Sequence, residues 1–239
     1  MKRVLALLIL AACLMTAVAC SAEPLPTMTA EELMDKAMAK MTACPAYEAE
    51  TLYEMTLTDT LGEQDTVRVT NSYKISERGF VLSFSNTVLT AEGETTYSLT
   101  QCITYCDNML YAKMTMDEET VVKQKEYAED LSLPQDPLEV FSFLTPEVLA
   151  QATVTCGTVD WTITVPVSAL EGEPSDPAAA DSDDVVTIVI SRLYTIKSIS
   201  FSIEEDGKTA TFRSSFFSFG RDRVSPPSDA EDYEEAPAF

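Results

Sequence analysis

The sequence predicts an α+β protein that is mainly β, in which one amphipathic helix precedes a single antiparallel sheet. Three observations support this fold class. Apolar residues from 30 to 41 recur with a helical period, whereas from Tyr47 onward apolar and polar residues alternate with a period of two. The breaks between the alternating runs are short, which favours an antiparallel meander. With 46% hydrophobic residues in 239, the chain can also bury a sizeable core.

An export signal is expected ahead of the helix. Lys2 and Arg3 precede an uncharged stretch at positions 4–22, and Glu23 is the first acid. This order of a positive segment, an apolar segment and small residues is typical of a signal peptide. The remainder of the chain is therefore expected at the outer face of the cytoplasmic membrane.

The small residues at positions 17–20, AVAC, favour a lipobox in which Cys20 is lipidated. Residues 1–19 would then be a signal peptide, and 20–28 would be the lipidated cysteine with a tether. Two acyl chains on Cys20 would suffice for stable anchoring. Three alternatives stay open: lipidation at Cys13, simple cleavage after A-x-A with secretion, and an uncleaved membrane anchor.

The expected helix begins at a capping box formed by Thr29 and Glu32 and stops before Pro45. Its apolar stripe carries three methionines, whose adaptable side chains suit either a core or the lining of an apolar ligand site. Further strands follow the first run at 47–58, and two short helices are expected where Asp136 and Thr145 each precede a proline. The expected elements are strands near 67–75, 80–84, 97–105, 159–165, 185–193, 195–204 and 208–219, and helices at 137–144 and 146–151.

The region from 29 to 224 is expected to be one domain. An acidic loop rich in proline and alanine interrupts it at 171–184, and the stretch 225–239 is expected to be an acidic tail. The last hairpin is expected to turn at Asp206-Gly207.

Composition excludes several classes of function. The chain has 16 basic and 39 acidic residues, a net charge of −23, and no histidine. It therefore lacks a histidine general base and histidine-ligated zinc, and its acidic surface disfavours nucleic acid. Its seven glycines are scattered, so no phosphate loop is present. We expect no enzymatic activity, no cofactor and no metal; a hydrolase using carboxylates is the least favoured alternative.

Four cysteines remain if Cys20 is lipidated and Cys13 is removed. An even count in an exported chain permits two disulfides. Two of the four would share one strand face about 13 Å apart at ~3.3 Å per residue, too far to bond with each other. Zinc binding and buried free thiols are the alternatives. The candidate disulfide residues are Cys44, Cys102, Cys106 and Cys156.

The end of the chain contains the segment 196–203, the turn at Asp206-Gly207, the aromatic-glycine stretch 216–220 and the run 224–230, VSPPSDA. With these features it resembles the LolA-like/LppX-like bacterial lipoprotein group, including Gram-positive lipoproteins of uncharacterised function. The resemblance spans about residues 27–233, and only its last part has the character of a motif.

The resemblance implies a strongly curved antiparallel half-barrel sheet, with the N-terminal helix and the short helices packed on its concave side. It also implies a non-enzymatic protein that binds an apolar, lipid-like ligand in the concavity. The alternative is an extracytoplasmic interaction or structural module with a filled core and an unknown protein partner. We expect the chain to be a monomer. The candidate ligand-lining residues are Met34, Met38, Met41, Tyr53, Met55, Tyr73, Tyr97, Leu99 and Ile103.

Overall fold

The computed structural model describes residues 25–58, 64–133, 136–170, 185–205, 208–220 and 223–236. The expected signal peptide, Cys20, the acidic loop 171–184 and the turn at Asp206-Gly207 lie outside the described residues.

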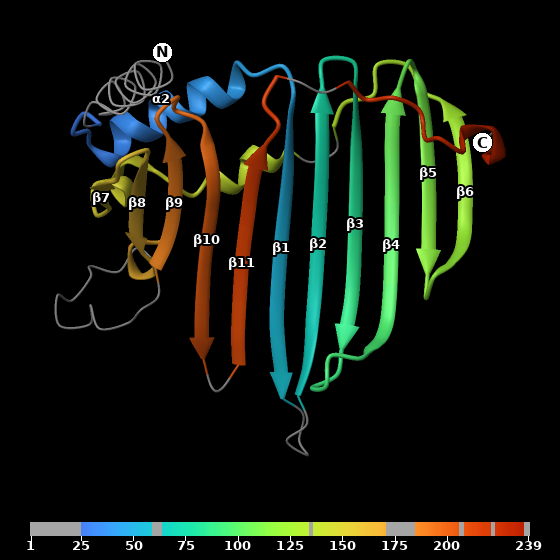
Figure 1. Ribbon diagram of the computed structural model, residues 1–239, viewed down its shortest axis with the longest axis horizontal. Helices are drawn as coiled ribbons and strands as arrows, with labels where there is room; N and C mark the ends of the chain where they lie inside the picture. Colours follow the sequence, from blue (N-terminus) through green and yellow to red (C-terminus); the bar gives the residue numbers. More distant parts are fainter. Residues whose placement is uncertain are drawn as a thin grey trace, which may run out of the picture.

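The described residues form one curved, open sheet of twelve strands with a few short helices (Figure 1). The strand order is β12-β6-β5-β4-β3-β2-β1-β11-β10-β9-β8-β7, and every pairing is antiparallel except that of β12 with β6. This confirms the expected fold class, a mainly β half-barrel. The strands are β1 (Tyr47–Thr58), β2 (Gln64–Ser76), β3 (Gly79–Leu89), β4 (Thr95–Cys106), β5 (Met109–Met116), β6 (Glu119–Tyr127), β7 (Thr153–Cys156), β8 (Asp160–Pro166), β9 (Val185–Ser191), β10 (Ile196–Glu205), β11 (Lys208–Phe217) and β12 (Glu234–Glu235).

The helix α2 (Ala30–Thr42) begins as its sequence predicts. The Thr29 hydroxyl accepts a hydrogen bond from the Glu32 N–H, and the Glu32 carboxylate accepts one from the Thr29 N–H, at 3.2 and 3.1 Å. Two further short helices start at the predicted proline positions. These are η1 (Pro137–Phe141) and α3 (Pro146–Leu149), while η2 (Val167–Ala169) and η3 (Ala230–Asp232) are single turns.

The register of the sheet assigns each side chain to one of two faces. Tyr53 pairs with Val69 on β2 and with Phe212 on β11, so these side chains share a face. That face also carries Phe216, whose ring lies 5.7 Å from the ring of Phe141 in η1. We call it the inner face, because the helices pack on it. The opposite, outer face is rich in serine and threonine on β10 and β11.

One half of the inner face is packed against helices, and we call it the covered half. It comprises the inner-facing side chains of β8, β9 and β10, which lie next to α2, η1 and α3 in the main hydrophobic core. Along β8 and β9 these buried, inner-facing residues alternate strictly with half-buried residues of the outer face. Its fully buried members are Trp161, Ile163, Val165, Val186, Ile188, Ile190, Ile196 and Ile199.

Part of the expected acidic tail packs against the sheet. Residues 223–236, which we call the C-terminal strap, pack on the outer face of β4 to β6 (Figure 1). The Tyr233 ring meets the Tyr111 ring edge-on at 5.4 Å, and Lys123 Nζ lies 2.9 Å from an Asp229 carboxylate oxygen. Near its end the strap forms β12, which pairs with β6 and becomes the edge strand on that side of the sheet.

Candidate functional site

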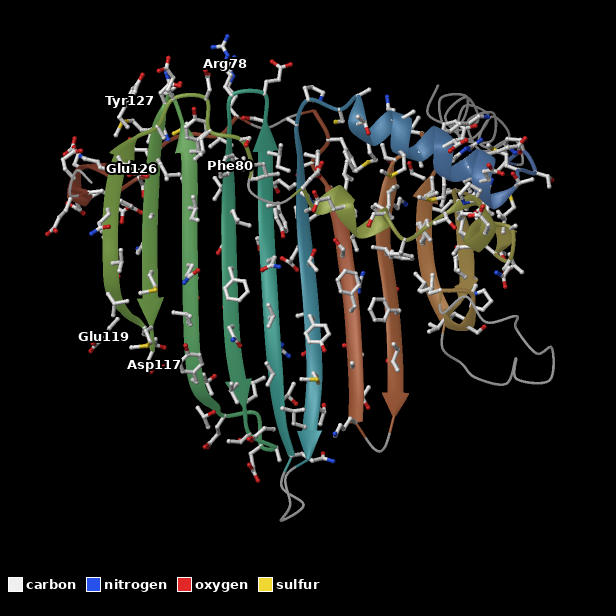
Figure 2. The ribbon with its side chains drawn as sticks, turned by 180° about the vertical axis from the view of Figure 1, so that it is seen from behind. Arg78, Phe80, Asp117, Glu119, Glu126 and Tyr127 are labelled. Carbon is white, nitrogen blue, oxygen red and sulfur yellow. The ribbon has the colours of Figure 1, made fainter. Side chains whose placement is uncertain are left out.

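The other half of the inner face is apolar, and of its described side chains only Phe201 and Phe212 pack against the main core. We call it the open half. Figure 2 views the molecule from behind, and no helix lies in front of the long teal and green strands there. Every side chain of this group is half-buried: Tyr53, Met55, Val67, Val69, Phe84, Val88, Tyr97, Leu99, Met114, Phe201 and Phe212.

These side chains form continuous rows across the strands. One row runs through Phe201, Phe212, Tyr53 and Val69, and beyond Asn86 it reaches Leu99. The rings of Phe201 and Phe212 are stacked, with centroids 5.1 Å apart. Such rows give an elongated apolar surface that crosses the strands.

Polar atoms within the open half are largely satisfied inside it. The Tyr53 hydroxyl donates to the Met55 sulfur at 3.6 Å, and the Gln101 side-chain amide donates to the Met114 sulfur at 3.7 Å. The exceptions are the side-chain oxygens of Asn71 and Asn86, which are inaccessible and have no hydrogen-bond partner. A buried acceptor without a donor is costly, so these two amides mark weak points in an otherwise apolar surface.

Burial raises the pKa of the two tyrosines at the border between the halves. The pKa of Tyr73 rises because the phenol is buried, and a hydrogen bond from Asn71 opposes part of that rise. The pKa of Tyr47 rises through burial and through the nearby Asp136 carboxylate. Its hydroxyl donates to Asp136 at 3.2 Å, which ties β1 to the start of η1. Both phenols are therefore neutral donors at physiological pH.

The structure divides the expected ligand-lining residues into two groups. Met34, Met41 and Tyr73 are buried in the main core, and Met38 packs against it. Their side chains hold α2 on the sheet. The remaining five share the inner face of β1 and β4: Tyr53, Met55, Tyr97, Leu99 and Ile103.

Sequence reasoning missed other members of the open half. It did not name Val69 or Phe84 among the candidate ligand-lining residues. The period-two alternation assigns these residues to one face, but it does not show whether a helix covers that face.

The expected disulfides are not supported, because Cys44, Cys102, Cys106 and Cys156 are all free in the structure. Cys102 and Cys106 lie on the outer face of β4, whereas Cys156 lies on the edge strand β7, eight strands away in the sheet order. At ~4.8 Å per strand that separation is about 38 Å, far beyond disulfide reach. Burial raises the pKa of the Cys102 and Cys106 thiols, which keeps both protonated near neutral pH.

Three hollows of 530 to 570 Å³ lie on the described surface, and none is lined mainly by the open half. Two of them adjoin the β2–β3 turn around Arg78. The third lies over the serine and threonine side of β10 and β11. We describe the open half as an apolar surface, because its side chains are half-buried and none of these three hollows encloses it.

The described residues contain no group of three or more Cys, Asp or Glu side chains placed to hold a metal ion. None of their helices has the length and apolar character needed to cross a bilayer.

Comparison with known proteins identifies no family for the chain. No family model matches it, and no curated protein matches it. Solved structures with a related shape include a β-barrel-like protein of the domain of unknown function DUF1849 from Brucella abortus, at 13% identity and a TM-score of 0.24, covering 74% of this chain and 98% of that one. A LolA superfamily protein from Nitrosomonas europaea aligns at 11% identity and a TM-score of 0.22, covering 83% and 96%.

A third solved structure, a DUF1329 family protein from Desulfovibrio piger, aligns at 8% identity with a TM-score of 0.25, covering 86% of this chain and 98% of that one. At such TM-scores the likeness carries no argument about ligand or activity. The curved sheet and its open half are therefore argued from this chain alone.

Proposed function

We propose that this protein is an exported, lipid-anchored, non-enzymatic protein that binds a lipid-like ligand on the open half of its inner face. The observation that supports the proposal is the set of half-buried apolar side chains on β1 to β5, β10 and β11. Large apolar surfaces left exposed on a soluble domain mark interaction sites for apolar partners.

The open half is long enough to hold an acyl chain along its whole length. Six strand spacings separate β10 from β5, which is about 29 Å at ~4.8 Å per strand. A bilayer core is about 30 Å thick, so one acyl chain spans about half of that. Each buried methylene contributes roughly 0.8 kcal/mol, so a single chain lying along the rows of aromatic and aliphatic side chains would be held strongly.

The remaining parts of the proposal rest on the sequence. Because the sequence has no histidine and no phosphate loop, we favour a binding protein over an enzyme, and we propose no cofactor. The lipobox at positions 17–20 supports anchoring at the outer face of the cytoplasmic membrane. We propose no nucleic-acid partner and a monomeric state.

Ligand binding is tested with a matched pair of variants on one strand. Val69→Asp places a carboxylate on the open half, whereas Thr70→Asp places the same charge on the outer face of β2. A fluorescent fatty acid, anthroyloxy-stearate, is titrated into the full chain. Because a carboxylate under an acyl chain loses its hydration, we expect at least a roughly tenfold weaker affinity for Val69→Asp and little change for Thr70→Asp.

Two results would contradict lipid binding: no uptake of the probe by the unaltered protein, or equal affinity in both variants. Circular dichroism of each variant checks that the sheet is intact. If no lipid is taken up, the interaction module with a filled core is favoured, because the covered half is already packed.

Anchoring is tested separately with Cys20→Ser. Loss of the acylated sulfur should leave the precursor unprocessed or release the protein from membranes. Unchanged processing together with unchanged retention would show that Cys20 is not the anchor.

A further inference from the structure

Two hairpin tips present exposed apolar side chains at the end of the sheet where α2 lies. Leu193, between β9 and β10, is 75% exposed, the highest value among the large apolar side chains of the described part. Val159, just before β8, is 55% exposed. The two tips adjoin, because the Arg192 N–H donates to the Val159 carbonyl at 3.2 Å.

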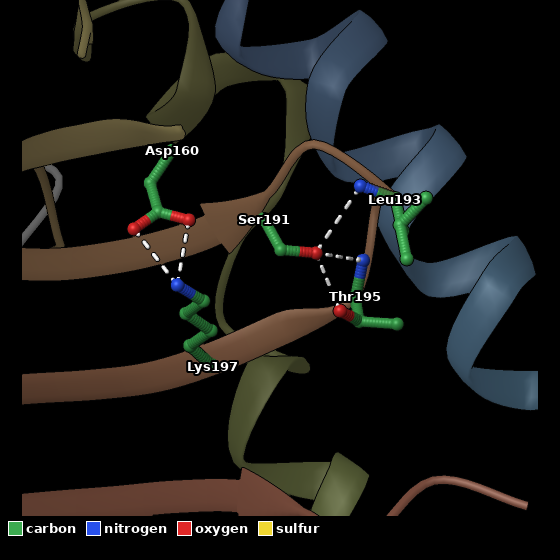
Figure 3. A network of polar contacts seen from close by, with 5 residues as sticks. All are labelled: Asp160, Ser191, Leu193, Thr195 and Lys197. Atoms are coloured by element: carbon green, nitrogen blue, oxygen red, sulfur yellow. Dashed lines mark hydrogen bonds and ion pairs between the residues drawn. The ribbon is translucent and has the colours of Figure 1, made fainter. Parts of the chain in front are cut away.

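The Leu193 tip is held by hydrogen bonds, as Figure 3 shows. The Ser191 hydroxyl oxygen accepts from the N–H groups of Leu193 and Thr195 at 3.3 and 3.2 Å, and it lies 2.5 Å from the Thr195 hydroxyl. Tyr194 adopts a left-handed conformation with φ of 59°, which is uncommon for a residue with a side chain. A strained turn with this many bonds keeps Leu193 pointing outward at a fixed place.

The tips lie beside the point where the described chain begins. The Trp161 indole N–H donates to the Pro26 carbonyl at 3.1 Å, and the Trp161 ring stacks on the Tyr194 ring at 5.3 Å. Pro26, Trp161, Tyr194 and Leu193 therefore form one contiguous group. Five residue steps separate Cys20 from Leu25, so a lipid on Cys20 can sit no more than about 18 Å from Leu25.

Charges of both signs lie near the tips. The Lys36 ammonium lies 5.3 Å from the centre of the Tyr194 ring, on a helix that also carries Glu31, Glu32 and Asp35. The nearby Asp160 carboxylate is neutralised by Lys197, whose Nζ lies 2.7 and 2.8 Å from its two oxygens (Figure 3). The exposed apolar side chains of the tips, rather than a basic patch, are therefore the feature that suits a lipid surface.

We infer that the Val159 and Leu193 tips form a docking surface for the lipid bilayer, on which the anchored domain rests. The inference depends on the lipid anchor of the proposed function. Leu193 and Val159 enter the interface between headgroups and acyl chains, and the Lys36 ammonium lies close enough to the tips to meet anionic headgroups. The docking fixes the orientation of the domain and places the α2 end of the sheet against the membrane.

The test uses tryptophan substitutions in the full, lipidated chain. The protein is reconstituted in vesicles of phosphatidylcholine and phosphatidylglycerol whose acyl chains carry bromine, which quenches tryptophan on contact. Leu193→Trp reports the docking tip. Val121→Trp is the matched control, because Val121 is an exposed residue of β6 near Asp117 and Glu119, which Figure 2 shows at the end of the sheet opposite α2. The unaltered protein supplies the background of the buried Trp161.

We expect Leu193→Trp to lose most of its added fluorescence and to shift its emission to shorter wavelength, with no quenching at Val121→Trp. Both positions are exposed, so neither change disturbs the core. Flotation of the vesicles reports anchoring separately. Protein that floats but is unquenched at position 193 overturns the docking surface, leaves the anchor standing and assigns the tips to a protein partner. Protein that does not float overturns both, while uptake of the fluorescent fatty acid tests ligand binding independently.

Discussion

The two halves of the inner face are built from the same kind of strand and differ in what lies on them. In the covered half, the inner side chains of β8 and β9, such as Ile163 and Ile188, are fully buried under α2 and the short helices. In the open half, the equivalent side chains of β2 and β4, such as Val69 and Leu99, are only half-buried. The comparison shows that alternation assigns side chains to one face of the sheet. That face becomes fully buried only where a helix covers it.

The largest expected effect separates the halves by stability. Ile188→Ala should lower the free energy of unfolding by about 3 kcal/mol, because it leaves a cavity in a packed site. Leu99→Ala, the matched change in the open half, should lower it by about 1 kcal/mol or less, since Leu99 is already partly hydrated. Urea denaturation of both variants measures the difference. Equal losses would mean that the two halves are equally packed.

One substitution in the open half is expected to raise the free energy of unfolding instead of lowering it. Asn86→Leu removes an inaccessible side-chain oxygen that has no hydrogen-bond partner, so we expect it to raise the free energy of unfolding by about 1 kcal/mol. It should also tighten binding of anthroyloxy-stearate, because the apolar row from Val69 to Leu99 becomes continuous. A loss of stability would show that Asn86 finds a partner in solution.

A substitution at the N-cap of α2 tests how much the capping hydrogen bond stabilises the helix that covers this half of the sheet. Thr29→Ala removes the side-chain oxygen that accepts the Glu32 N–H, and should cost about 1 kcal/mol. Hydrogen exchange should quicken in α2 while the amides of β3 and β4 stay unchanged. Thr29→Ser, which keeps the hydroxyl, should restore protection in α2.

The smallest effect concerns the outer face. The hydrogen-bonded ion pair with Lys123 lowers the pKa of Asp229, so the C-terminal strap gains stability above the carboxyl's unfolded value near 3.9. That gain is lost as the pH falls through the lowered pKa. We expect Asp229→Asn to weaken protection of the β12 amides slightly at pH 7, and to match the unaltered protein in strongly acidic solution.

Glu92→Gln in the β3–β4 turn, which makes no ion pair in the described part of the chain, serves as the control for Asp229→Asn. A difference from the unaltered protein that persists with equal size at the lowest pH would assign the effect of Asp229→Asn to packing rather than charge.

Much of the fold could be predicted from local pattern. The capping box at Thr29, the prolines after Asp136 and Thr145, and the alternation from Tyr47 each specify a local conformation that the structure confirms. The hairpin of β5 and β6 was not predicted. In its turn Asp117 and Glu118 both have a positive φ, and glutamate is not among the residues that indicate such a turn in a sequence.

The candidate site was only partly predictable. Tyr53 and Leu99 were assigned to an apolar inner face, which the register confirms. The methionines of α2 were placed with them, yet Met34 and Met41 are buried in the core, because the side of α2 that carries them faces the sheet. How the helices are distributed over the sheet depends on long-range packing, which leaves no trace in a local period.

The pairing of β1 with β11 determines how late the sheet can be completed in a chain that is synthesised from its amino terminus. Thr51 and Ser214 are bonded across the sheet although 163 positions separate them along the chain. The hairpins from β1 to β6 join strands that are neighbours in the chain, so they can form early. The other edge of β1 keeps its backbone amides and carbonyls unpaired until β11 has been synthesised. During that interval the unpaired edge of β1 can pair with another chain, so rapid completion of the chain protects against aggregation.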